Sequence, residues 1–89
     1  MHVLVICHPV PGGDQDAFRR LVPGETVALR ELKAKGLLIE AWSPGRPGAV
    51  LVLDVADEAA AAGLVAAFPL VQADLITTEI VPLHPIDLS

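Results

Sequence analysis

Four short apolar runs and two longer amphipathic segments alternate along the chain. The short runs are rich in Val, Ile and Leu, which predicts strands. In the two longer segments apolar residues recur every three or four positions, which predicts helices. Clusters of Pro and Gly separate several of these segments and predict tight loops. The predicted order is strand, helix, strand, strand, helix and strand, at residues 2–8, 15–35, 37–43, 49–55, 57–68 and 75–83.

Residues that cap or interrupt helices mark the two amphipathic segments. Asp14 or Asp16 is expected to cap the first helix, and Asp57 the second, because a carboxylate accepts hydrogen bonds from the free N–H groups of a first turn. Gly36 is expected to stop the first helix as a left-handed C-terminal residue. Pro23 lies within this helix and lacks an N–H group, so a break or kink is predicted there.

The order of the elements predicts an α+β fold of the ferredoxin-like βαββαβ type. Such a fold has a four-stranded antiparallel sheet with both helices on one face. The strand at residues 49–55 is apolar on both sides, so the other face is also expected to be covered. With 89 residues, 53% of them hydrophobic, the chain is a single domain (1–89) with more apolar surface than a small monomer buries. Two sheets packed face to face, in a barrel-like homodimer, would bury the surplus.

Charge and cysteine content restrict the classes of partner. The net charge is −5, and the six basic residues form no cluster, which argues against nucleic acid and against an anionic membrane surface. No apolar run is long enough to cross a bilayer, and the N-terminal segment lacks the basic region of a signal peptide. Cys7 is the only cysteine, so neither an internal disulfide nor a zinc site is expected, and a buried thiol fits the reducing cytoplasm.

Glu40 is a carboxylate inside an apolar strand, two positions before the only tryptophan, Trp42. Strict alternation places Leu38, Glu40 and Trp42 on one face of the sheet. Two interpretations are open. Glu40 is either a buried group beside an aromatic wall, suited to act as a general acid or base, or a charge that protects an edge strand in water.

Other residues are candidates for chemistry by position. Glu25 falls on the apolar stripe of the first helix, so it either faces the sheet or serves as a first-turn acid after Pro23. His8 ends the first strand and is a candidate proton carrier. Arg46, in a proline-flanked loop, is either a clamp for a carboxylate ligand or a solvated charge. The three histidines have no metal-binding spacing, and no phosphate-binding loop or nucleophile elbow is present.

Several short motifs, in this order and spacing, resemble the muconolactone isomerase family over about residues 17–85. They are the helix ETVALRELKAKG from Glu25 to Gly36, the strand with Trp42, the segments VLDV at 52–55 and FPL at 68–70, and VPLHP at 81–85. The resemblance implies a ferredoxin-like dimeric α+β barrel, assembled as a dimer or a ring of dimers. It also implies an enzyme that shifts a double bond in a small lactone without metal or cofactor. Glu25 and Trp42 match a glutamate and a tryptophan typical of the family.

Three positions depart from the family pattern. Thr26 replaces a lysine, Glu40 a histidine and Ser43 an arginine, so groups able to hold an anionic lactone are missing. The expected function is therefore a cofactor-free isomerase-type enzyme, or a related cyclase, acting on a small molecule other than muconolactone. The alternative is a non-catalytic oligomerising or ligand-binding domain. The predicted site consists of a carboxylate base and second proton carrier (Glu40, Glu25, His8) and substrate-binding residues (Trp42, Phe18, Arg46), with no metal.

Overall fold

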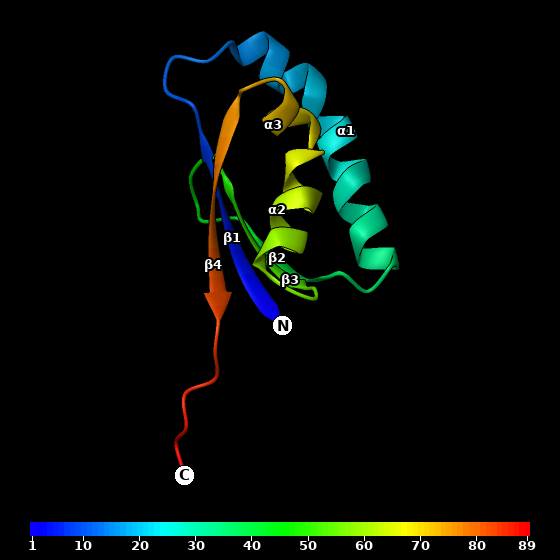
Figure 1. Cartoon of the computed structure of the whole chain (residues 1–89). Coiled ribbons are helices and arrows are strands. Elements are labelled where there is room, and N and C mark those ends of the chain that lie inside the picture. The colour runs from blue at the N-terminus through cyan, green and yellow to red at the C-terminus, as the bar shows by residue number, and fades with distance from the viewer.

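The computed structural model describes residues 1–89 and has two layers, an antiparallel sheet and a layer of helices on one of its faces (Figure 1). The predicted α+β architecture and element order are confirmed, with one short helix added before the last strand. The elements are β1 (His2–Pro9), α1 (Gln15–Ala34), β2 (Leu38–Trp42), β3 (Ala49–Asp54), α2 (Glu58–Ala66), α3 (Pro69–Gln72) and β4 (Ile76–Leu83).

The strand order is β2-β3-β1-β4, so β1 and β3 form the middle of the sheet. Each of these two strands is hydrogen-bonded to a strand on both sides, which fits their nearly continuous apolar sequence. The pairs Val3 with Leu53 and Val5 with Leu51 point toward the helices. These four side chains, together with Phe68, are the largest fully buried ones. The core therefore lies between the central strands and the helix layer.

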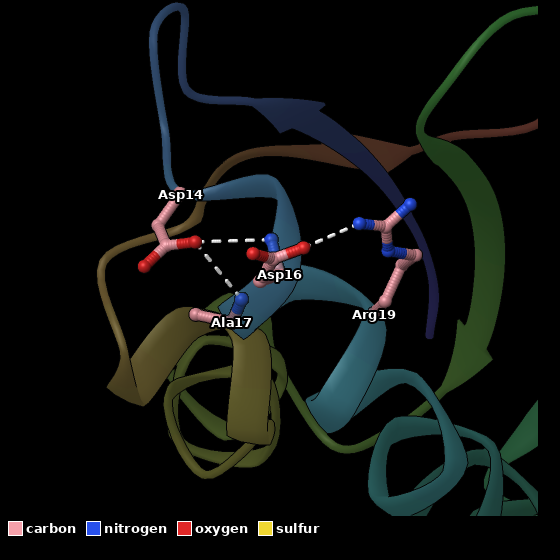
Figure 2. A network of polar contacts seen from close by, with 4 residues as sticks. All are labelled: Asp14, Asp16, Ala17 and Arg19. Atoms are coloured by element: carbon pink, nitrogen blue, oxygen red, sulfur yellow. Dashed lines mark hydrogen bonds and ion pairs between the residues drawn. The ribbon is translucent and has the colours of Figure 1, made fainter.

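Asp14, one of the two caps that the sequence predicts, caps the start of α1. An oxygen of its carboxylate accepts from the backbone N–H groups of Asp16 and Ala17, at 3.0 and 3.1 Å, and Arg19 pairs with Asp16 one turn further on (Figure 2). Asp57 caps α2 in the same way, through the N–H of Ala60 at 2.8 Å. Both helix starts are therefore fixed by side chains that the sequence identifies.

The sequence predicts a break or a kink at Pro23. A break is wrong, because α1 runs without interruption over Gln15–Ala34. Pro23 lies on the exposed side of the helix, where water can satisfy the carbonyl that loses its partner. The buried side of α1 packs on the core through residues such as Leu32. Packing of that apolar side outweighs the tendency of one proline to break the helix.

The second predicted helix, at residues 57–68, corresponds to α2, and α3 is an additional short helix that follows it. α2 ends at Ala66, Phe68 then turns into the core in an extended conformation, and Pro69 begins α3. Proline suits a first helical position, because its missing N–H would be unpaired there in any case. The turn at Phe68 separates the two helices and directs α3 toward α1.

The sheet face opposite the helices has no cover in the single chain. Its central side chains, from β1, β3 and β4, are apolar and only half-buried: Leu4, Ile6, Val50, Val52 and Val81. We call this whole side of the sheet the bare face. Residues 84–89 leave β4 and extend away from the body, with Ile86 and Leu88 exposed (Figure 1). None of the helices is both long and apolar enough to cross a lipid bilayer.

Gly48, just before β3, is a position where only glycine fits. Its φ is +129°, and a Cβ there would lie 2.6 Å from the carbonyl oxygen of Cys7. We expect Gly48→Ala to lower the free energy of unfolding by roughly 1–3 kcal/mol. Gly63→Ala, inside α2 with nothing within 4 Å, is the control and should raise it by about 0.5–1 kcal/mol. Urea unfolding measures both, and equal midpoints would contradict the structure of this loop.

Candidate active site

A cavity of about 260 Å³ lies between α1, α3 and the helix-covered face of the sheet. Nine of its 13 lining residues are hydrophobic, so it offers an apolar environment with few polar groups. The lining comes from β1, α1, the β2–β3 loop, β3, α3 and β4: Cys7, Phe18, Val22, Glu25, Thr26, Leu29, Pro47, Gly48, Ala49, Leu51, Phe68, Leu70 and Ile76.

Glu25 is the only carboxylate that lines this cavity. It is half-buried, and its Oε1 accepts a hydrogen bond from the backbone N–H of Leu70 at 3.1 Å. That N–H belongs to the first turn of α3, where Phe68 provides no side-chain cap. Burial raises the pKa of Glu25 above its ordinary value, while the hydrogen bond from Leu70 acts in the opposite direction. Glu25 is thus an oriented carboxylate that accepts a proton more readily than an exposed one.

Cys7 also lines the cavity, and the sequence identified it only as a buried thiol. It follows Val3 and Val5 on the inward face of β1. Burial, and secondly the negative charge of Glu25, raise the pKa of the thiol to about 11. Cys7 therefore remains a protonated thiol at neutral pH and is a poor nucleophile.

A second cavity, of about 330 Å³, shares Phe18 and Pro47 with the first. The β1–α1 loop and the start of α1 provide most of its other walls, including Asp14. Phe18 thus forms part of the wall of both cavities. Arg46 directly precedes Pro47 but is exposed and lines neither cavity.

Glu40 and Trp42 lie on the bare face, with the sheet between them and the cavity. The indole Nε1 of Trp42 donates to Oε2 of Glu40 at 2.9 Å, and 62% of the Trp42 surface is exposed. The prediction that Leu38 shares their face is wrong. An irregularity between Leu38 and Glu40 pairs Leu38 with Leu53 on the helix side, and Glu40 with Val52 on the bare face. A β-bulge of this kind changes the side to which the following residues point.

His8 is also on the bare face, where its Nε2 lies 3.2 Å from Oε1 of Glu79. The structure therefore brings Glu25 and Phe18 together, and places Glu40, Trp42 and His8 on the opposite side of the sheet. Cys7, Thr26, the loop at 47–48 and the N–H of Leu70 are the cavity groups that the sequence did not reveal. Only the alternation along β1 pointed to Cys7. No group of three or more His, Cys, Asp or Glu side chains is arranged to hold a metal ion.

Comparison with solved structures identifies the fold. A crystal structure of muconolactone isomerase at 3.3 Å resolution matches with a TM-score of 0.76 and 22% sequence identity, over 100% of this chain and 96% of the isomerase. No protein-family model matches the sequence, and no curated protein does so either. The chain therefore has a muconolactone isomerase-like fold, which confirms the fold that the sequence motifs implied.

The raised pKa of Glu25 predicts a specific dependence of stability on pH. Glu25 ionises less readily in the folded chain than in the unfolded chain, so the unfolded state loses its proton first as pH rises above about 4.5. Ionisation of Glu25 then costs stability, and this loss continues as pH rises through the folded pKa. The Glu25→Gln variant has no ionisable side chain at this position. We therefore expect the stability of wild type relative to Glu25→Gln to fall as pH rises from about 4.5 through the raised pKa of the folded chain.

Urea midpoints of the two proteins across this range measure the effect. Glu31→Gln, at an exposed site on the same helix, removes the same charge outside the cavity and serves as the control. A difference between wild type and Glu25→Gln that is independent of pH would show that burial does not perturb this carboxylate.

Proposed function

We propose that this protein is a cofactor-free isomerase that shifts a double bond in a small carbonyl compound other than muconolactone, with Glu25 as the base. The observation that carries the proposal is one oriented carboxylate in an otherwise apolar cavity. A base in such surroundings gains proton affinity through desolvation and is held in a fixed direction, which are the two requirements of general-base catalysis. The muconolactone isomerase-like fold is compatible with this activity but supports it only by analogy.

The proposed reaction moves one proton between two carbons of the substrate. Glu25 takes a proton from the carbon next to the carbonyl, and the electrons of the broken C–H bond pass into an enolate. The same carboxyl group then returns the proton to the far end of the conjugated system, which shifts the double bond and leaves Glu25 ionised again. Oε1 is held by the N–H of Leu70, whereas Oε2 makes no hydrogen bond and is available for the proton. The apolar walls keep water from quenching the enolate.

The remaining predicted site residues lie outside the cavity, so the proposal gives them other tasks. Glu40, Trp42 and His8 lie on the bare face, and we assign them to contacts with a partner subunit rather than to proton transfer. Arg46 is on the exposed β2–β3 loop, whose neighbouring Pro47 borders the cavity. Arg46 lines neither cavity, and we assign it to the solvated surface of this loop.

We also propose that the protein acts as a homodimer, alone or within a ring of dimers, paired through the bare face. Five central side chains of this face are aliphatic and only half-buried, and Trp42 extends the apolar area toward the β2 edge. The free thiol of Cys7 fits a reducing compartment, so we place this assembly in the cytoplasm.

A non-catalytic function is the alternative. The same cavity would serve a ligand-binding domain, and the same bare face an oligomerising one. Turnover separates the two functions, because a binding domain would retain an unchanged ligand, whereas an isomerase would release a product with a shifted double bond.

The proposal predicts different effects for the two candidate carboxylates. Glu25→Gln removes the base but keeps an oxygen that can accept from Leu70, so we expect kcat to fall by about 10²–10⁴. Glu40→Gln should retain nearly full activity, because its side chain lies beyond the sheet. A panel of β,γ-unsaturated lactones and ketones, followed by the ultraviolet absorbance of the conjugated product, provides the assay. Full activity of Glu25→Gln, or a comparable loss in Glu40→Gln, would rule out Glu25 as the base.

Two variants, each with one valine changed to glutamate, test the proposed dimer. Val52→Glu places a charge at the centre of the bare face, so we expect the molar mass in solution to fall to that of the single chain. Val27→Glu puts the same charge on α1, at a position that is already 52% exposed, and should leave the mass unchanged. Light scattering coupled to gel filtration measures both. A wild-type protein that is monomeric, or a Val52→Glu variant that remains paired, would exclude this interface.

A further inference from the structure

The ionisable groups around the cavity carry no positive charge. Glu25 and Cys7 are the only titratable side chains that line it, and Asp14 is the only one that lines the neighbouring cavity. Cys7 is neutral at physiological pH because burial raises the pKa of its thiol. The charged side chains that line the two cavities are therefore carboxylates only.

None of the basic side chains compensates for these acids. All six lie at exposed positions, and none lines either cavity: Arg19, Arg20, Arg30, Lys33, Lys35 and Arg46. Arg19 is already paired with Asp16. A partner subunit on the bare face would not add a cation, because the sheet would separate its side chains from the cavity. A carboxylate ligand would thus be buried beside Glu25 without a counter-ion, an arrangement that weakens its binding.

The polar groups of the cavity also favour one kind of uncharged ligand. Oε2 of Glu25 is a free acceptor, and the hydroxyl of Thr26 donates to the carbonyl of Val22 at 3.1 Å, which leaves its lone pairs available. The thiol of Cys7 is a weak donor. Acceptors therefore dominate, and a ligand satisfies them by presenting an acidic C–H or an O–H group. At about 260 Å³ the cavity is smaller than the roughly 300–1,000 Å³ of common ligand pockets.

We infer that the substrate is an uncharged, enolisable carbonyl compound of about one ring in size, and that the cavity excludes carboxylates. This inference rests on the proposed function and defines its substrate class. The sequence pointed to the same preference through its departures at Thr26, Glu40 and Ser43, but Glu40 lies on the other side of the sheet. Exclusion of anions comes from Glu25 inside the cavity and Asp14 beside it.

Two probes that differ only in charge test the substrate class. One is an unsaturated five-membered lactone with a carboxymethyl group, and the other is its methyl ester. Titrations followed by the backbone amide NMR signals of Leu70 and Ala49, both residues of the cavity lining, give the two dissociation constants without any need for turnover. We expect the ester to bind at least about tenfold more tightly than the acid in wild type, since a like charge is absent.

Two variants locate the source of this preference. In Glu25→Gln the ratio of the two constants should fall toward one, because the buried charge is gone. Glu31→Gln has the same change in net charge at an exposed site of α1, and its ratio should equal that of wild type.

The outcomes separate the substrate class from the reaction. Tighter binding of the ester without any double-bond shift supports the substrate class and counts against the proposed isomerase. Equal or tighter binding of the acid in wild type overturns the substrate class, even if the acid is isomerised. Absence of binding by both probes at millimolar concentration also overturns it, because an open apolar cavity should admit an uncharged ring.

Discussion

A central strand that is apolar on both faces is the constraint from which the rest of the structure follows. β1 pairs with β3 on one side and β4 on the other, so both of its faces must be removed from water by packing rather than by further strands. The helices of an 89-residue chain cover one face only. Their layer creates the core and the cavity, whereas the other face keeps apolar side chains that the single chain leaves only half-buried. The candidate chemistry and the candidate assembly are thus located on opposite sides of one sheet.

The hydrogen bond between Glu25 and Leu70 connects the cavity to the fold. It joins α1 to α3 across 45 positions of sequence, and it gives the short α3 helix a cap that its own segment lacks. The same bond occupies one carboxylate oxygen and leaves the other free. Partial burial of this acid opposes stability, and an apolar side chain at position 25 would pack without that cost. Functional groups in apolar surroundings commonly carry such a cost.

The sequence predicted the fold well because its signals are local and repeated. The apolar runs, the caps at Asp14 and Asp57, and the length of the connections all agree on βαββαβ. Prediction failed where tertiary packing decided the outcome. Pro23 does not interrupt α1, because the buried side of that helix continues to pack on the sheet past the proline.

The candidate site was harder to predict than the fold, because it depends on the side of the sheet to which each side chain points rather than on residue type. A single irregularity after Leu38 reverses the side of the sheet on which Glu40 and Trp42 lie, and no residue in the strand signals it. Glu25 was identified as a candidate from its place on the apolar stripe of α1. Its bond to a backbone N–H of α3 was not predictable, because that partner carries no side-chain signature. Cys7 faces the helix layer, as Val3 and Val5 do, because side chains alternate along β1.

The position of Trp42 has a practical consequence for spectroscopy. It is the only tryptophan in a chain without tyrosine, so nearly all intrinsic fluorescence above the phenylalanine range comes from this one indole. The indole is exposed at the edge of the bare face, and the sheet shields it from the cavity. Its emission therefore reports what covers the sheet, and a ligand that enters beside Glu25 leaves it largely unchanged. Intrinsic fluorescence would therefore respond to the proposed pairing through the bare face, and only weakly to a ligand in the cavity.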